Sequence, residues 1–337
     1  MKTNYFKFIG AFLILIFIIG CNSEEKVKVG ISIGPDHERW LKDRDYLVQR
    51  LENHGAQVFV LEAGNNERMQ SKQVEELVTK DKIDVLIIIP VNSETAGLMV
   101  DNAKRTKEGL KVIAYDRMIK NCMLDFYISF DNVKVGELQA DYLTRIKSGG
   151  KYALLGGDQT DNNSILLRLG QMNVLQPLVT KGDVKIVIDR FVDGWNANLA
   201  YQIVDDYLKE NKGLDAIVAS NDELARGASM ALDKYNMSTK VLLSGQDAQI
   251  DACKRIIEGK QTMTVYKFIE SLAHSAANIA IQLGKNEPMS NSYATVNNGR
   301  KLVPSLLLPS MIQVTPENIR MTVIADGYLD EKQVFGN

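Results

Sequence analysis

The stretch Ile83-Asp84-Val85-Leu86-Ile87 has the composition of a buried strand, and it recurs later in the chain as Leu214-Asp215-Ala216-Ile217-Val218. A second echo follows each copy, since Lys111-Val112-Ile113-Ala114 is matched by Lys240-Val241-Leu242-Leu243. Short apolar runs rich in β-branched residues are typical of strands covered on both faces of a parallel sheet. Because the two echoes have nearly the same spacing, the chain is predicted to contain two related halves.

Strand-like runs alternate with stretches of helical period on both sides of these echoes. In the first half, the expected strands are 27–33, 58–61, 85–90 and 112–116, and the expected helices are 39–54, 68–79 and 95–107. In the second half, the strands are 152–156, 184–191, 216–220, 241–245 and 262–266, with helices after Asn163 and at 197–208 and 224–235. A helix at 271–283 and a proline-containing tail from Asn297 follow. This alternation predicts an α/β fold of two doubly wound parallel-sheet lobes.

The composition agrees with two globular domains and argues against several classes of protein. A chain of 337 residues is longer than one ordinary domain needs. Its 40 Lys and Arg against 42 Asp and Glu give a net charge of −2, which favours no nucleic-acid partner. Three cysteines cannot form a disulfide framework, and the three histidines are scattered. We expect no cofactor and no metal site, and we expect Cys122 and Cys253 to be small buried residues.

The first twenty residues have the features of an export signal. Lys2 and Lys7 precede an apolar run at 8–20, which is too short to span a bilayer core of about 30 Å. Cys21 follows directly, and this arrangement resembles a bacterial lipoprotein signal; an ordinary secretory peptide with an incidental cysteine is the alternative. We expect a lipoprotein signal peptide at 1–20, lipidation of Cys21 and a tether at 21–26. The protein would then lie in the periplasm or cell envelope, attached to a membrane only through its lipid.

Polar and aromatic side chains follow the carboxyl ends of the expected strands, where doubly wound sheets bind ligands. They are Arg39-Trp40, Asp116-Arg117, Asp161-Asn162-Asn163, Asp193-Gly194-Trp195, Asn221-Asp222, Gln246-Asp247 and Lys267. Charged groups make strong hydrogen bonds to hydroxyls, and indole faces can cover the C–H patches of a pyranose ring. The set therefore favours a site for a polyhydroxylated ring.

Each of these residues also has a structural alternative. Asn and Asp after a strand are often only helix N-caps, which applies to Asn162 and Asp222 in particular. Asp116 and Arg117 could form a structural ion pair, the two tryptophans could simply pack, and Lys267 could be a solvated strand end.

Motifs for catalysis are mostly absent. The chain has no phosphate-binding loop, no nucleophile elbow and no dinucleotide-binding glycine pattern. A carboxylate pair for glycoside hydrolysis stays open, since any two of Asp116, Asp161, Asp222 and Asp247 could be close. Nearby arginines and a lysine would keep such carboxylates ionised, which suits hydroxyl binding better than general-acid catalysis. We predict a binding protein and not an enzyme.

Several longer strings carry a family resemblance. They are Glu38-Arg39-Trp40-Leu41-Lys42-Asp43-Arg44-Asp45, Asp125-Phe126-Tyr127-Ile128-Ser129-Phe130-Asp131-Asn132, Val192-Asp193-Gly194-Trp195, Ser244-Gly245-Gln246-Asp247-Ala248 and Gln261-Thr262-Met263-Thr264-Val265-Tyr266-Lys267. In this order they resemble the periplasmic D-xylose-binding proteins, which are sugar-binding solute-binding proteins of ABC transporters. The loop from Ile33 to Arg39 is shorter than in that family, and Phe268 stands where a proline is expected.

The resemblance implies the periplasmic binding protein type I fold, with three hinge crossovers near Asp131–Lys134, Tyr266–Phe268 and Leu302–Pro304. The N-terminal lobe would comprise 27–131 plus 268–302, and the C-terminal lobe 132–267 plus 303–337. Among the residues at the strand ends, the family pattern places the sugar contacts on ten: Arg39, Trp40, Asp116, Arg117, Asp161, Asn163, Trp195, Asn221, Asp247 and Lys267. It implies that the two lobes close over one monosaccharide, with D-xylose as the favoured ligand. It also implies delivery of this sugar to an ABC permease. The alternatives are a sensor that serves a chemoreceptor or membrane histidine kinase, and an envelope enzyme that acts on sugars.

Overall fold

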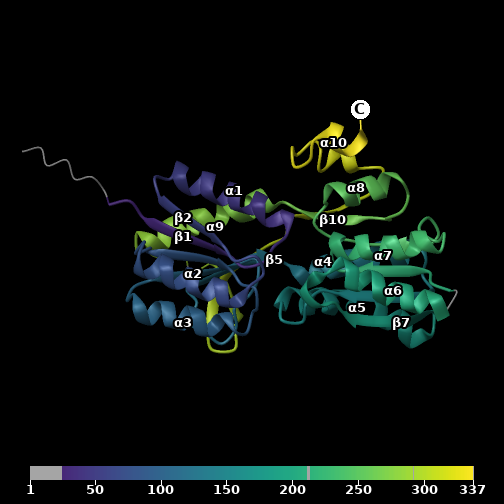
Figure 1. Cartoon of the computed structure of the whole chain (residues 1–337), viewed down its shortest axis with the longest axis horizontal. Helices are drawn as coiled ribbons and strands as arrows, with labels where there is room; N and C mark the ends of the chain where they lie inside the picture. The colour runs from purple at the N-terminus through teal and green to yellow at the C-terminus, as the bar shows by residue number, and fades with distance from the viewer. Residues whose placement is uncertain (1–24, 211–212, 291, 337) are drawn as a thin grey trace, which may run out of the picture.

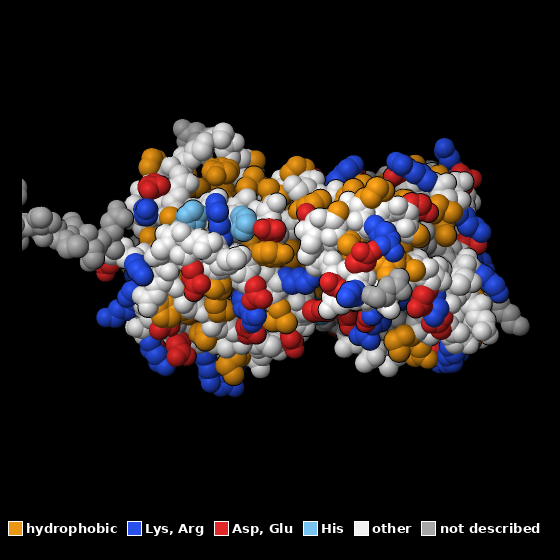
Figure 2. Space-filling model, turned by 90° about the horizontal axis from the view of Figure 1, so that it is seen from above, with side chains coloured by type: hydrophobic (Ala, Val, Ile, Leu, Met, Phe, Trp, Pro, Cys, Tyr) orange, Lys and Arg blue, Asp and Glu red, His pale blue; other side chains and the backbone are white. Residues whose placement is uncertain are grey.

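The computed structural model describes residues 25–210, 213–290 and 292–336, which form two α/β lobes lying side by side (Figure 1). The expected signal peptide and Cys21 lie outside the described residues. None of the helices described is long and apolar enough to cross a membrane. Seen from above, acidic and basic side chains are interspersed over both lobes (Figure 2).

The first lobe is built on a seven-stranded sheet with the order β11-β12-β5-β4-β3-β1-β2. Its strands are β1 Lys28–Ile33, β2 Gln57–Glu62, β3 Val85–Ile89, β4 Lys111–Tyr115, β5 Phe126–Phe130, β11 Ala294–Asn297 and β12 Leu302–Leu308. All neighbours are parallel except β11 and β12. Apolar clusters pack one face under α1 (Glu38–Asn53) and α9 (Ile269–Gly284), and the other under α2 (Glu67–Thr79) and α3 (Ala96–Thr106).

The second lobe repeats this plan around a parallel sheet with the order β7-β6-β8-β9. Its strands are β6 Gly150–Gly156, β7 Val184–Phe191, β8 Ala216–Ala219 and β9 Leu242–Leu243. A bridge between Gln246 and Val265 continues the sheet to β10 (Thr264–Lys267), which pairs antiparallel with β13 (Met311–Val314). The helical segments are α4 Asn132–Ile146, α5 Asn162–Lys181, η1 Asp193–Trp195, α6 Ala197–Glu210, α7 Asp222–Lys234, α8 Ile250–Ile257, η2 Ile319–Met321 and α10 Glu331–Phe335.

The two sheets share one strand order. The first four strands of the first lobe are arranged β2-β1-β3-β4, and those of the second lobe are arranged β7-β6-β8-β9. The echoed sequences occupy equivalent positions in this order. The first echo lies in β3 and β8, and the second lies in β4 and at β9. The fold is thus the expected pair of doubly wound lobes.

Three links join the lobes. One follows β5 at Asp131, which caps α4 by accepting a hydrogen bond from the Lys134 amide, and one follows β10 at Phe268. The third was expected at Leu302–Pro304 but lies after Leu308. There β12 is still paired with β5 in the first sheet, and the chain then turns into β13 beside β10. The expected assignment of residues from 303 onward to the second lobe is therefore wrong for the rest of β12.

Some elements were absent from the predicted series, namely β5, α4, α8 and the strands after Ala294. Pro304 explains why β12 did not look like a strand, since proline lacks an N–H donor and is rare inside sheets. In the structure, Pro304 is paired only with β11, and pairing with β5 begins at Ser305. The missing N–H donor of Pro304 therefore costs no hydrogen bond between β12 and β5.

Candidate ligand-binding site

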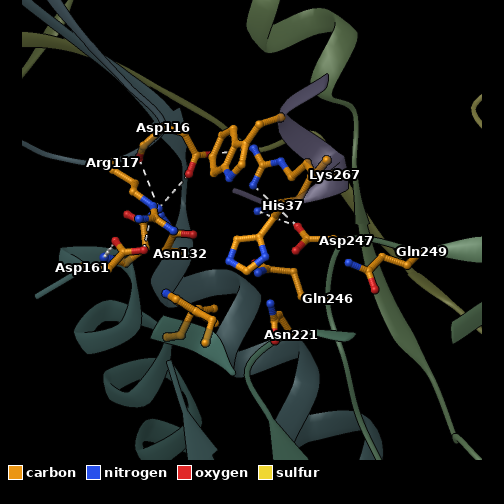
Figure 3. A pocket seen from close by; sticks show the side chains of 15 residues that line it. His37, Asp116, Arg117, Asn132, Asp161, Asn221, Gln246, Asp247, Gln249 and Lys267 are labelled. Atoms are coloured by element: carbon orange, nitrogen blue, oxygen red, sulfur yellow. Dashed lines mark hydrogen bonds and ion pairs between the residues drawn. The ribbon is translucent and has the colours of Figure 1, made fainter. Parts of the chain in front are cut away.

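One cavity lies between the lobes, at the carboxyl ends of the parallel strands (Figure 3). All ten residues predicted from the sequence line it: Arg39, Trp40, Asp116, Arg117, Asp161, Asn163, Trp195, Asn221, Asp247 and Lys267. The structure adds five lining residues that were not among the predicted sugar contacts: His37, Asn132, Leu167, Gln246 and Gln249. The structure thus brings the predicted residues together, while their contacts with a ligand stay a prediction.

The five added residues differ in whether a sequence signal could have identified them. Gln246 was among the polar residues at the strand ends, but the family pattern did not select it as a sugar contact. Asn132 begins α4, a helix absent from the predicted series. His37, Leu167 and Gln249 carry no such signal, because they depend on how the helices approach the cavity.

Backbone geometry at three cavity residues points to a site held in a defined shape. Trp195, the last residue of η1, has a φ of 56°. Asp116 follows β4 with a φ of 61°, and Asp247 follows β9 with a φ of 97°. Non-glycine residues rarely adopt these left-handed conformations unless surrounding contacts hold them. The carbonyl oxygen of Asp116 accepts hydrogen bonds from the hydroxyls of Ser129 at 2.7 Å and Tyr127 at 3.3 Å. Strand β5 therefore holds the backbone of Asp116 in place.

Arg39 links three carboxylates on one side of the cavity. Its guanidinium lies 2.6 Å from Asp116, 3.2 Å from Asp43 and 3.5 Å from Asp247, and its side chain is only 7% exposed. The indole of Trp40 lies beside this group, with the Arg39 Cζ atom 4.5 Å from the ring centre. Arg39 comes from α1 of the first lobe and Asp247 follows β9 of the second, so this group spans both lobes.

A second group joins the lobes on the opposite side. The Arg117 Nε atom lies 2.9 Å from Asp161, and Asn163 donates a hydrogen bond of 2.8 Å to Asp116. Outside the cavity, the Ser93 amide donates to the Thr160 carbonyl oxygen at 2.9 Å, and the Ser93 hydroxyl accepts from the Asn162 amide at 3.2 Å. With direct contacts on both sides, the structure represents the closed arrangement of the lobes.

Burial and neighbouring charges set the protonation of the acidic residues. Burial opposes ionisation of Asp116, but the charges of Arg39 and Lys267 outweigh it and lower the pKa of this carboxyl below its usual range. Burial raises the pKa of Asp161, although Arg117 counteracts it. Behind the cavity, burial raises the pKa of Asp43 to about 6, and this carboxylate accepts a hydrogen bond from Tyr115. Asp116 is therefore a permanent acceptor at neutral pH.

Unpartnered polar atoms gather at the cavity. Buried polar atoms in proteins nearly always have hydrogen-bond partners, so exceptions suggest a missing ligand or water. Among the described residues, seven buried side-chain nitrogen or oxygen atoms have none, and four of them belong to residues that line the cavity: Asn163 Oδ1, Trp195 Nε1, Gln246 Oε1 and Asp247 Oδ1. The last lies 3.2 Å from Lys267 Nζ, which is an ion-pair distance without hydrogen-bond geometry. Donors and acceptors together suit hydroxyl groups, which can act as both.

The structural alternatives have mixed outcomes. Asn221 caps α7 by accepting a hydrogen bond from the Leu224 amide, and it also lines the cavity. Lys267 is only 2% exposed, so it is not a solvated strand end. Trp195 packs against Gly157, where a Cβ atom would lie 2.2 Å from the indole, and it lines the cavity as well. Asp222 is buried behind the cavity, and Cys122 and Cys253 are buried free cysteines as expected.

Comparison with known proteins identifies the family. Residues 29–288 match the model of the periplasmic binding protein domain. The chain belongs to the periplasmic binding proteins. Members of this family are solute-binding components of transport and not enzymes, so we treat the cavity as a binding site without catalysis.

Two relatives of this periplasmic binding protein match it over nearly its whole length. The D-xylose-binding periplasmic protein of Haemophilus influenzae is 47% identical over 99% of both chains. The protein of the same name from Escherichia coli K12 is 49% identical over 92% of this chain and 93% of its own. These alignments extend beyond both ends of the matched domain.

Solved structures agree with the fold. The carbohydrate transporter solute-binding protein of Chloroflexus aurantiacus, in complex with D-glucose, has a TM-score of 0.83 and 30% identity over 92% of this chain and 98% of its own. An ABC transporter solute-binding protein of Clostridium phytofermentans with bound β-D-glucose has a TM-score of 0.84 and 27% identity, covering 91% and 99% of the two chains. The type I fold of two lobes around one cavity is therefore shared with both.

Proposed function

We propose that this periplasmic binding protein captures one neutral monosaccharide, D-xylose, between its lobes and delivers it to an ABC permease. The observation that carries the proposal is the balance of charged and unpartnered polar groups around the cavity. The cations Arg39, Arg117 and Lys267 face the carboxylates of Asp116, Asp161 and Asp247. The charges offset one another pair by pair, which suits a ligand that needs strong donors and acceptors but carries no charge.

The position and lining of the cavity support a small sugar. The cavity is enclosed between the two lobes and lined by side chains from both, which favours a monosaccharide over a longer saccharide. Trp40 and Trp195 add aromatic surface on the two lobes, and such surface can cover the C–H groups of a sugar ring. Both relatives at 47% and 49% identity are named for D-xylose, which supports this pentose as the ligand.

Closure follows from the distribution of the lining residues. Arg39, Trp40, Asp116 and Arg117 belong to the first lobe, while Asp161, Asn163, Trp195, Asn221 and Asp247 belong to the second. A sugar bound to one lobe gains its remaining hydrogen bonds only when the other lobe reaches it. This difference in affinity shifts the population toward the closed form.

Isothermal titration calorimetry on the chain from Ser23 tests the proposal, with D-xylose, D-ribose and D-glucose titrated separately. We expect D-xylose to bind most tightly, with the dissociation constant near the micromolar range that corresponds to about −8 kcal/mol. Tighter binding of D-glucose would assign the site to hexoses. Absence of binding heat for all three sugars, checked by a thermal-shift screen of other aldoses, would contradict the proposal.

We also propose that the protein is exported to the periplasm and anchored through a lipid on Cys21. The apolar run at 8–20 and the cysteine directly after it support this location. The test is fractionation of cells that produce the full chain or its Cys21→Ser variant. We expect the full chain in the membrane fraction and the variant outside it. Equal distribution of the two forms would contradict the lipid anchor.

A further inference from the structure

The C-terminal segment 315–336, named here the C-terminal clasp, lies over α8 and β10 of the second lobe (Figure 1). It follows β13 and contains η2 and α10, and its apolar residues Val323, Leu329 and Val334 are buried. The hydroxyl of Tyr266 in β10 donates a hydrogen bond to Asp326 of the clasp. The rings of Tyr266 and Tyr328 lie 4.7 Å apart. These contacts fix the clasp to the second lobe.

The clasp supports the backbone of a cavity residue. The Tyr328 hydroxyl donates a hydrogen bond of 3.1 Å to the carbonyl oxygen of Asp247. Asp247 and the next residue, Ala248, have φ values of 97° and 50°, which non-glycine residues rarely adopt. A buried hydroxyl that holds this peptide therefore helps to keep the Asp247 carboxylate directed at the cavity.

The clasp also contacts the first lobe. Lys42 lies on α1, three residues after Arg39, and its ammonium group donates a hydrogen bond of 2.7 Å to the carbonyl oxygen of Tyr328. The same group lies 3.9 Å from the centre of the Tyr328 ring, within the range of a cation–π contact. Burial lowers the pKa of Lys42, so this ammonium group is partly withdrawn from water.

These contacts make Tyr328 a junction between the lobes at a point outside the cavity lining. Its hydroxyl holds the Asp247 loop of the second lobe, while its carbonyl oxygen and ring receive Lys42 from the first. Because α1 moves with the first lobe and the clasp with the second, the Lys42 contacts break when the lobes separate. Neither Lys42 nor Tyr328 lines the ligand cavity.

We infer that the C-terminal clasp stabilises the closed form through Lys42 and orients Asp247 through Tyr328. Both are positioning residues that tune ligand affinity without touching the ligand. The effect on sugar affinity rests on the proposed function, whereas the effect on lobe closure does not.

Two variants separate the roles. Lys42→Met removes the ammonium group and keeps an unbranched apolar side chain, whereas Tyr328→Phe removes only the hydroxyl. Lys72→Met on α2 is the matched control, since Lys72 is an exposed lysine of the same lobe and is remote from the clasp. Thermal unfolding of each variant checks that the fold is retained.

Titration calorimetry with D-xylose is the first measurement. A net hydrogen bond contributes about 0.5–1.5 kcal/mol, so we expect the dissociation constant to rise about two- to tenfold for Lys42→Met and for Tyr328→Phe. The control is expected to bind as the unchanged protein does. Unchanged affinity in both variants, or the same loss in the control, would overturn the role in binding.

The distance between the lobes is the second measurement and needs no ligand. Spin labels attached through Thr106→Cys and Lys181→Cys, both exposed and in different lobes, report this distance by pulsed electron resonance. We expect Lys42→Met to move the ligand-free population toward larger distances, and Tyr328→Phe to leave it unchanged because the Lys42 contacts remain. If the unchanged protein binds no D-xylose, the proposed function fails and this measurement alone decides on closure. An unaltered distribution in Lys42→Met would overturn the clasp.

Discussion

Asp247 has a rare backbone conformation and lies beside a buried cation. Its carboxylate lies 3.2 Å from Lys267 Nζ and 3.5 Å from Arg39. Lys267 is almost fully buried, and Asp247 is the carboxylate that lies within ion-pair distance of it among the described residues. Removing one member of a buried charged pair leaves the other uncompensated, which costs more than the pair itself contributes. Asp247 is therefore the residue at which a small chemical change has the largest expected effect.

We predict that Asp247→Asn weakens D-xylose binding by about 2 kcal/mol, or about thirtyfold, because it removes the charge beside Lys267 and keeps the side-chain shape. Asparagine also tolerates the left-handed conformation of this position. The measurement is titration calorimetry. Asp206→Ala is the control, since its side chain is 73% exposed and pairs only at the surface with Lys209. Binding by Asp247→Asn at the unchanged affinity would remove Asp247 from the ligand contacts.

At the scale of the element, helix N-termini supply both structure and ligand contacts. Asp161 caps α5 and Asn221 caps α7, and both residues line the cavity. A residue type chosen for capping is thus also available to a ligand, which is why the sequence pattern left both interpretations open.

Asn221 separates these two roles. Asn221→Ser keeps a capping oxygen, whereas Asn221→Ala does not, and both remove the amide from the cavity. We predict that both variants weaken D-xylose binding equally, while only Asn221→Ala lowers the free energy of unfolding, by about 1 kcal/mol relative to Asn221→Ser. Calorimetry and denaturant unfolding measure the two effects. Full affinity in Asn221→Ser would show that the residue serves only as a cap.

Protonation of Asp222, the first residue of α7, is expected to make the stability of the folded protein depend on pH. Its carboxylate accepts hydrogen bonds from Gln261, Thr264 and the Gln249 amide. Burial raises its pKa to about 7, although Arg255 opposes this. An aspartate in an unfolded chain titrates near about 3.9. The folded protein therefore retains a proton that the unfolded chain has lost, and its stability falls as the pH rises from about 4 to about 7.

Asp222→Asn should remove this dependence. We predict that, between about pH 5 and about pH 8, the unchanged protein loses at least about 1 kcal/mol more of its free energy of unfolding than the variant does. Asparagine cannot accept all three hydrogen bonds, but that loss is the same at both pH values. Parallel denaturant curves at the two pH values measure the difference. Identical pH dependence in both proteins would contradict the raised pKa.

At the scale of the whole molecule, the lobe plan was more predictable from the sequence than the links were. Buried parallel strands such as β3 and β8 are continuous apolar runs, so their composition alone indicates them. Strand β12 was not predicted because it contains Pro304, which is unusual inside a strand. Its place in the first sheet also depends on pairing with β5, which is distant in the sequence. The same holds for the site. Strand ends identified the region of the site, and the family pattern selected ten lining residues from it, whereas His37 and Leu167 lie there only because of how the helices pack.

Ligand-driven closure is the prediction that belongs to this scale. The contacts of Ser93 with Thr160 and Asn162 link the lobes at the rim of the cavity and must break on opening. We predict that D-xylose lowers the radius of gyration measured by small-angle X-ray scattering, because the sugar favours the closed form. Sucrose at equal concentration is the control, since a disaccharide exceeds the cavity. An unchanged radius with saturating D-xylose would contradict closure by the ligand.

The late return of the chain to the first sheet has a consequence for how the protein is made. Strand β12 lies between β5 and β11, yet the chain between β5 and β12 builds most of the second lobe, from α4 to β10. The first sheet is therefore incomplete until about nine-tenths of the polypeptide has emerged from the ribosome, and sheets built from such distant segments assemble slowly. Slow assembly of this sheet would keep the chain unfolded for longer, and an unfolded chain is the form that a translocation channel can thread.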